Sequence, residues 1–374
     1  MERHVKLSRY SRAGSALAVG ALALTLAACG SDPEAPGAES SGGATDSGAA
    51  SLSGELSGGG ASSQESAMEA WRAGFQQANP DATVNYDPVG SGGGRTGFGD
   101  GTYAFAGSDA ALEDDELTAA EAQCGAGGVI EFPGYVSPIA VAFNLPGVDS
   151  LNLTPDVIAQ IFAGEITTWN DDAIAADNAD ADLPDTKITV VHRSDESGTT
   201  ENFQDYLAAA APDSWDHEPE GVWPIDGQES AQGTSGVVSA AQSGEGTITY
   251  ADASQISDLG TVAVGVGDEF VPYSAEAAAE VVAQSPRTEG TAEGIYSIDL
   301  KRDIPGTYPI VLVSYSLACG TYADEATAEL VKGFMGYLVS EEGQQAAADA
   351  AGSAPLSSDI RDAVLPSIEA IAAG

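Results

Sequence analysis

The feature that most constrains the fold is an arrangement that recurs from residue 52 onward: a short apolar run, a turn rich in glycine and serine, and an amphipathic segment. The first copy joins the apolar run 52–56 to the turn 57–63 and to a segment in which Met68, Trp71 and Phe75 share one helical face. Predicted strands that alternate with predicted helices are typical of α/β proteins. The sequence therefore predicts an α/β fold.

Later segments give similar signals of strands and helix ends. Further strands are predicted over residues 83–86, 103–106 and 187–191. Ser62 and Glu65 have the spacing of a capping box at the start of the first helix. Thr154 is predicted to begin a later helix and Gly164 to end it.

The start of the chain has the pattern of an exported protein. Residues 1–28 combine basic side chains with an apolar run too short to span a bilayer, which predicts a signal peptide. The next residue, Cys29, ends a Leu-Ala-Ala-Cys tetrapeptide that resembles a bacterial lipobox, in which the cysteine carries lipid such as palmitate. An ordinary signal peptide followed by a chance cysteine is the alternative. Residues 29–51 have the composition of a flexible tether, so we expect an extracytoplasmic protein anchored to the outer face of the cell membrane.

The charge balance excludes nucleic acid as a partner. The chain has 13 basic and 57 acidic side chains, a net charge of −44. Removal of the signal peptide leaves nine basic against 56 acidic side chains, a net charge of −47. Such a surface repels nucleic acid and favours solubility.

Two cysteines, Cys124 and Cys319, remain in the part predicted to fold. An exported compartment permits a disulfide, and one pair is the simplest use of two cysteines; two buried free thiols are the alternative. Only His192 and His217 follow the signal peptide, and no Cys-x-x-Cys or His-Glu-x-x-His spacing occurs. We therefore expect neither a metal site nor a cofactor.

Several turns rich in glycine and serine come directly before predicted helices. The start of a helix offers unpaired N–H groups and the positive end of the helix dipole, which together favour an anion. Arg193 adds a charge that can bind two oxygens at once. Hydroxyl donors come from Ser62, Ser91, Ser197 and Thr199. One such turn is usually only a cap, but the set predicts an anion-binding site.

The order and spacing of six motifs resemble the phosphate-binding subunit (PstS) of the high-affinity phosphate uptake transporter, an ABC transporter. The resemblance covers nearly all of residues 54–360. Four motifs are similar to the family's phosphate loops: Gly58–Ser63, Asn85–Gly94, Phe105–Asp109 and Val191–Thr200. Two more resemble family segments outside the site, Ile161–Asp171 and Gly246–Tyr250.

The resemblance implies a two-domain, periplasmic-binding-protein-like (type II) fold with the ligand in the cleft between the domains. Domain one would comprise residues 52–138 plus 308–374, and domain two residues 140–305. Two β-rich runs, 129–143 and 309–318, would cross between them as the hinge. In this layout both cysteines of the expected disulfide belong to domain one.

The resemblance also implies the role of each binding residue. Asp109 would accept a hydrogen bond from protonated phosphate, and Arg193 would bind two oxygens while Asp195 holds its guanidinium in place. Ser63 stands where the family usually has Phe, so its backbone donor remains but the apolar cover over the ligand is lost. The expected phosphate-binding residues are Ser62, Ser63, Ser91, Asp109, Arg193, Ser197, Gly198 and Thr199.

We therefore expect a monomer that binds inorganic phosphate without chemistry on it and delivers it to a membrane permease. One alternative is a binding protein for another tetrahedral oxyanion, such as sulfate or a phosphonate. A secreted phosphatase is less expected, because neither a Gly-x-Ser-x-Gly elbow nor a Walker motif occurs. Two competing interpretations concern single positions. Ser108–Asp109 would be only a helix cap, and Arg193–Asp195 would be only a surface ion pair.

Overall fold

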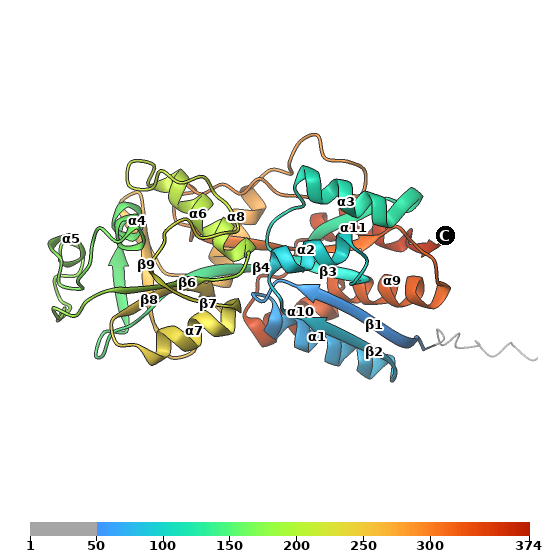
Figure 1. The fold of residues 1–374 in the computed structure, drawn as a ribbon, viewed down its shortest axis with the longest axis horizontal. Helices are drawn as coiled ribbons and strands as arrows, with labels where there is room; N and C mark the ends of the chain where they lie inside the picture. The colour runs from blue at the N-terminus through green and yellow to red at the C-terminus, as the bar shows by residue number, and fades with distance from the viewer. Residues whose placement is uncertain (1–50) are drawn as a thin grey trace, which may run out of the picture. The chain divides into compact units, whose positions relative to one another are not determined.

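Two long buried strands, β4 (Val129–Asn144) and β11 (Val311–Cys319), link the two halves of the fold (Figure 1). The structure is a computed structural model that describes residues 51–374. The predicted signal peptide, Cys29 and the tether up to residue 50 lie outside the described residues.

Strand β4 changes its pairing partner midway along its length. Its first part, up to Pro138, pairs antiparallel with β11, and its continuation from Ile139 pairs antiparallel with β8 (Thr247–Asp252). One sheet therefore runs through both halves in the order β2-β1-β3-β11-β4-β8-β6-β7. The predicted crossing runs are these two strands.

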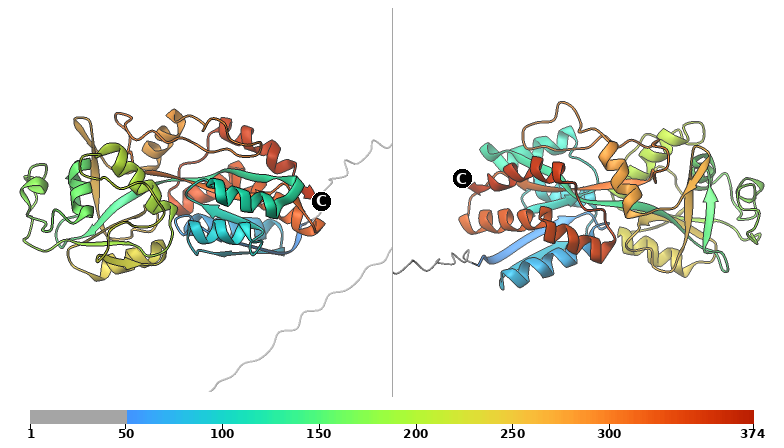
Figure 2. Two further views of the ribbon diagram at one scale, coloured as in Figure 1. Left: turned by 45° about the horizontal axis from the view of Figure 1, so that its top comes forward. Right: turned by 180° about the vertical axis from the view of Figure 1, so that it is seen from behind.

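The first half, here called the first lobe, is built on the parallel strands that precede β4. Its strands are β1 (Ser53–Gly60), β2 (Asp81–Asp87) and β3 (Phe105–Ser108), with β11 antiparallel to β3. Its helices are α1 (Glu65–Ala78), α2 (Ser91–Gly99), α3 (Asp114–Cys124), α9 (Glu325–Val339), α10 (Glu341–Ala351) and α11 (Ser358–Glu369). Helix α9 contacts both α10 and α11, and the three lie side by side in the rear view of Figure 2.

The second half, here called the second lobe, lies between β4 and β11 in the sequence. Its strands are β5 (Ser150–Leu153), β6 (Thr189–Arg193), β7 (Glu229–Ala231), β8, β9 (Gly260–Val266) and β10 (Glu269–Val271). Its helices are α4 (Pro155–Ala163), α5 (Asp172–Ala175), α6 (Gly198–Ala210), α7 (Gly233–Ser243) and α8 (Ala275–Gln284). Short elements elsewhere are a 3-10 turn (Gly125–Gly127), β12 (Thr321–Tyr322) and β13 (Ala372–Ala373).

The predicted apolar face of α1 forms part of the core. Met68, Trp71 and Phe75 are all buried, as their spacing predicts. The ring of Phe334 on α9 lies 5.3 Å from the ring of Phe75 and 5.3 Å from that of Phe105. Aromatic packing of this kind holds α1 and α9 against the sheet.

The predicted ends of α4 are confirmed, but the predicted capping box of α1 is wrong. Thr154 caps α4 through its side chain, and Gly164 ends that helix in the left-handed conformation. Helix α1 instead follows Gln64 without a side-chain cap. The hydroxyl of Ser62 is turned away from α1, because it bonds to Thr234 of the second lobe.

The predicted turn 57–63 is shorter in the structure, because β1 continues through Gly60. Gly58 pairs with Phe105 of β3. A side chain at Gly58 would overlap the Phe105 ring, so glycine is what permits strand pairing here. The sequence suggested a turn where glycine in fact serves close strand contact.

Cys124, at the end of α3, forms a disulfide with Cys319, at the end of β11, as predicted. Their Cα atoms are 5.1 Å apart, although 195 residues separate them in the sequence. The bridge closes a loop that contains the whole second lobe. Within residues 51–374, no helix has both the length and the apolar character needed to cross a membrane.

We predict that the double variant Cys124→Ser/Cys319→Ser is less stable than the wild type by about 2–4 kcal/mol, because the bridge restricts the unfolded chain. Denaturant unfolding measures this difference, and alkylation without reductant should label neither cysteine of the folded wild type. Two alkylated thiols, or an unchanged unfolding free energy, would contradict the prediction.

Candidate functional site

The predicted binding residues come together where the two lobes meet. The first lobe contributes the loops after β1 and β3 and the start of α2, and the second lobe contributes the loop between β6 and α6. All of their side chains are buried: Ser62, Ser63, Ser91, Asp109, Arg193, Ser197 and Thr199. Residues that only cap helices at the protein surface would be exposed, whereas these side chains are buried.

Asp109 is held by hydroxyl groups from both lobes. Its Oδ1 accepts a hydrogen bond from Ser63 Oγ at 2.7 Å, and its Oδ2 accepts one from Thr199 Oγ1 at 2.8 Å. Its backbone N–H donates to Ser91 Oγ at 3.1 Å. The next helix begins only at Asp114, and the side chain is 2% exposed. Asp109 is therefore not a helix cap.

Burial raises the pKa of the Asp109 carboxyl, because its charged form loses water. The hydrogen bonds from Ser63 and Thr199 and the positive charge of Arg193 oppose this rise. A carboxylate has about four lone-pair positions, so these two hydroxyls leave room for another donor. Asp109 can therefore accept a proton-bearing group of a ligand.

Arg193 is a buried cation with a fixed orientation. Asp195 accepts hydrogen bonds from its Nε, at 2.8 Å, and from its Nη2. The N–H of Gly233 also donates to Asp195 Oδ1, at 3.0 Å. Arg193 is only 4% exposed, which excludes the surface ion pair. A guanidinium has five N–H donors, so Asp195 leaves several for an anion.

The electrostatics of Asp195 fit this supporting role. Burial acts to raise the pKa of its carboxyl, but the hydrogen bonds and charge of Arg193 and the N–H of Gly233 outweigh it. The pKa of the Asp195 carboxyl is therefore lowered, and this carboxyl is ionised at neutral pH.

Two helices begin at the site and direct their N–H groups toward it. Helix α2 starts at Ser91, and α6 starts at Gly198 with Ser197 Oγ accepting the N–H of Thr200 at 3.2 Å. A Cβ atom on Gly198 would lie 2.8 Å from the backbone of Asp109, so glycine lets α6 approach the first lobe. Two helix starts at one point favour an anion.

Thr234, in the first turn of α7, was not anticipated from the sequence. Its N–H donates to Ser62 Oγ at 3.0 Å, and its Oγ1 lies 3.0 Å from the same atom. The sequence contained a signal, since Gly233 to Gly236 repeat the pattern of glycine and hydroxyl residues, here in the first turn of the helix. The partner, 172 residues away, left no signal.

Arg95 of α2 is a second buried cation that sequence analysis did not identify. It donates to Glu116 at 2.7 Å and to Ser108 at 3.0 Å in the first lobe, and to Glu196 of the second lobe at 3.0 Å. Arg95 therefore adds an ion pair between the lobes beside the Asp109 cluster.

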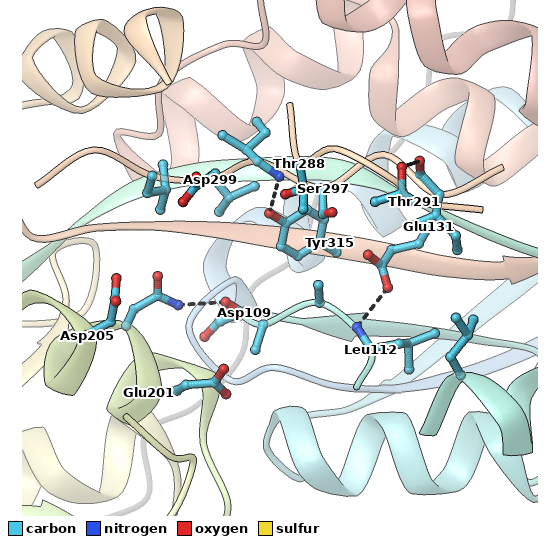
Figure 3. A pocket seen from close by; sticks show the side chains of 18 of the residues that line it. Asp109, Leu112, Glu131, Glu201, Asp205, Thr288, Thr291, Ser297, Asp299 and Tyr315 are labelled. Carbon is cyan, nitrogen blue, oxygen red and sulfur yellow. Dashed lines mark hydrogen bonds between the residues drawn. The ribbon is translucent and has the colours of Figure 1, made fainter. Parts of the chain in front are cut away.

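A cavity of about 710 Å³ adjoins Asp109 (Figure 3). Glu131, Glu201 and Asp205 line it, with Arg302 paired to Asp205 at 2.8 Å. Burial raises the pKa of Glu131 and of Glu201 to about 7 in each case. These acidic side chains disfavour an anion in the cavity. The cavity differs in this respect from the cluster of hydroxyl groups around Asp109. In the described part of the chain, no group of three or more His, Cys, Asp or Glu side chains is placed to hold a metal ion.

Comparison with known proteins is consistent with this geometry. A family model described as a PBP superfamily domain matches residues 40–342. The phosphate-binding protein PstS 3 of Mycobacterium tuberculosis is 36% identical over 386 residues, which cover 98% of this chain and 100% of the relative. PstS 2 of the same species is 32% identical over 376 residues, again 98% and 100%.

A solved structure has a similar fold. It is that of a high-affinity periplasmic phosphate-binding protein, PfluDING, bound with phosphate. Its TM-score is 0.68 at 23% identity, over 83% of this chain and 93% of that chain. The likeness shows the expected two-domain α/β fold.

Asp252, at the end of β8, is a further buried carboxyl close to the junction of the lobes. It accepts hydrogen bonds from Tyr135 at 3.1 Å and from Ser254 Oγ at 2.6 Å. Burial raises its pKa from 3.8 to about 7. The folded protein therefore binds more protons than the unfolded chain between about pH 4 and pH 7.

We predict that the free energy of unfolding falls as pH rises from 5 to 8, by at most about 1.4 kcal/mol per pH unit for each group such as Asp252. Asp252→Asn should flatten this dependence, whereas Asp258→Asn, an exposed neighbour, should not. Denaturant midpoints across this pH range measure the effect. A midpoint that rises with pH would contradict the prediction.

Proposed function

This chain belongs to the PstS family of phosphate-binding proteins, within the PBP superfamily, and we propose that it captures inorganic phosphate and delivers it to the permease of an ABC transporter. The observation that carries the proposal is the buried cluster in which Asp109, an acceptor, lies among hydroxyl donors, helix starts and the fixed cation Arg193. That combination suits an anion that still carries a proton.

The binding residues follow from this cluster. Arg193 binds two phosphate oxygens, with Asp195 holding its guanidinium, and Asp109 accepts the proton of phosphate. The remaining donors are the hydroxyls and backbone N–H groups of Ser62, Ser63, Ser91, Ser197, Gly198 and Thr199. Ser63 and Thr199 supply their backbone N–H groups, since their hydroxyls already donate to Asp109. Where the family usually has Phe as an apolar cover over the ligand, Ser63 instead donates a hydrogen bond to Asp109.

The same geometry favours phosphate over sulfate. Phosphate keeps at least one proton near neutral pH, whereas sulfate has none. Sulfate would bring unprotonated oxygens against the Asp109 carboxylate in a buried site, and the two negative charges would repel each other with no hydrogen bond between them. Sites built to bond a hydroxyl reject analogues that lack it by roughly 10⁴–10⁵-fold.

Binding without chemistry is the activity that the cluster supports best. The hydroxyls of Ser63, Ser91 and Thr199 are engaged with Asp109, and that of Ser62 is engaged with Thr234. Ser197 Oγ accepts the N–H of Thr200, and the Nδ1 of the nearest histidine in the sequence, His192, lies 2.8 Å from the backbone oxygen of Arg193. None of these arrangements activates a serine as a nucleophile. A phosphatase, the less favoured alternative, would release phosphate from a chromogenic ester.

The two lobes act as the domains of this binding protein. Domain one comprises residues 52–138 plus 308–374, and domain two comprises residues 140–305. The change of partner along β4 between Pro138 and Ile139 supports this division. The crossing strands β4 and β11 are the hinge, and contacts such as Thr199–Asp109 close the cleft of the monomer.

Outside the cytoplasm, a lipid on Cys29 anchors the protein to the membrane, after removal of the signal peptide 1–28. The tether 29–51 then gives the binding domains freedom to reach the permease. The lipobox-like tetrapeptide and the composition of the tether support this arrangement.

For the anchor, we predict that Cys29→Ala moves the protein from the membrane fraction into the medium, because the acyl chain is lost. Mass spectrometry of the wild type should find a chain that begins at acylated Cys29. Cleavage elsewhere, or an unmodified Cys29, would refute the anchor.

For the ligand, we predict that the wild type prefers phosphate to sulfate by roughly 10⁴-fold. Asp109→Asn should narrow this ratio by about tenfold or more, because an amide can turn an N–H toward an ionised oxygen. Competition titrations at one pH measure both ratios, and Asp115→Asn, an exposed residue of the same lobe, serves as control.

Equal binding of sulfate and phosphate by the wild type would refute the phosphate assignment. An unchanged ratio of phosphate to sulfate binding in Asp109→Asn would show that Asp109 does not determine the selectivity.

A further inference from the structure

The first turn of α7 reaches across the junction of the lobes to Ser62. Both Thr234 and Ser62 are buried, at 1% and 2% exposure. The N–H of Thr234 and its Oγ1 each lie 3.0 Å from Ser62 Oγ. The backbone and the side chain of one residue of the second lobe therefore both contact a hydroxyl of the first lobe that, under the proposed function, binds phosphate.

These contacts limit what the Ser62 hydroxyl can offer a ligand. A serine hydroxyl has one O–H to donate and two lone pairs with which to accept. The N–H of Thr234 is a donor only, so it occupies one lone pair of Ser62. If the Thr234 hydroxyl donates as well, it occupies the second lone pair. Ser62 then has only its O–H left, and it can act toward a ligand only as a donor.

We propose that Thr234 is a specificity-determining positioning residue, which makes Ser62 a donor only and so selects phosphate with one proton over phosphate with two. The inference rests on the proposed function. Asp109 accepts the single proton of the doubly charged ion. The second proton of the singly charged ion would face Ser62 Oγ. With the Thr234 hydroxyl as donor, both lone pairs of that oxygen are occupied, and a buried donor without an acceptor weakens binding.

The same turn of α7 also supports the cation of the site. The N–H of Gly233 donates to Asp195 Oδ1 at 3.0 Å, and Asp195 holds Arg193. The start of α7 thus contacts the hydroxyl of Ser62 in the first lobe and, through Asp195, holds the guanidinium of Arg193 in the second lobe. Both arrangements favour the more highly charged form of the anion.

Other charged groups lie at the site, and the test must separate their effects on binding from that of Thr234. The carboxyl of Asp109 and the Arg193–Asp195 pair face the same cluster, and Asp252 lies close enough to act on Asp109 through its charge. All four side chains are the same in the wild type and in a Thr234 variant. A difference between their pH profiles therefore reports on Thr234.

The experiment measures the Kd of inorganic phosphate between pH 5.5 and pH 8.5 for the wild type, Thr234→Val, Thr234→Ser and Ser235→Ala. Valine removes the hydroxyl but keeps the side-chain shape, serine restores the hydroxyl, and Ser235 is an exposed residue of the same helical turn. Should Thr234→Val fail to fold, Thr234→Ala takes its place.

In the wild type, binding should tighten as pH rises and the doubly charged ion becomes the major form. In Thr234→Val, Ser62 regains an acceptor, so the ratio of Kd at low pH to Kd at high pH should fall by about 3- to 10-fold. Thr234→Ser and Ser235→Ala should keep the wild-type ratio.

Weaker binding by the same factor at every pH would show a merely structural role for Thr234 and overturn the inference, as would an unchanged profile in Thr234→Val. In both cases the wild type still binds phosphate, so the proposed function stands. A wild type that does not bind phosphate would overturn both.

Discussion

The rest of the site depends on the cost of burying the Asp109 carboxyl between the lobes. A buried carboxylate without hydrogen bonds is destabilising by several kcal/mol. Here the bonds come from the hydroxyl of Ser63 in the first lobe and from that of Thr199 in the second. No single lobe satisfies the carboxyl alone, so the contact between the lobes and the chemistry of the site are the same set of hydrogen bonds.

Positive charge at the site is scarce and locally fixed. The described residues carry three buried arginines, and each is paired with a carboxylate: Arg95 with Glu116 and Glu196, Arg193 with Asp195, and Arg302 with Asp205. A chain of this net charge repels anions at long range. Capture must therefore depend on donors within hydrogen-bond distance, which act only once the anion is in the cleft.

Much of the fold and of the site follows from local sequence. Periodicity predicts α1, the capping residues predict the ends of α4, and the β-rich runs predict the crossing strands. The turns rich in glycine predict Ser91 and Gly198 at helix starts. These features depend on neighbours in the chain, so the chain alone reveals them.

Contacts between residues far apart in the sequence were harder to predict. Ser62 has the spacing of a cap, yet Thr234, 172 residues away, determines the orientation of its hydroxyl. Ser63 donates its hydroxyl to Asp109 because the tertiary fold places β1 beside β3, and no local pattern indicates that bond.

A crystal structure with phosphate tests the account most directly. It should show one tetrahedral anion bound by the guanidinium of Arg193, with one oxygen within hydrogen-bond distance of Asp109. An anion bound elsewhere, or one that leaves Asp109 and Arg193 without contact, would contradict the account.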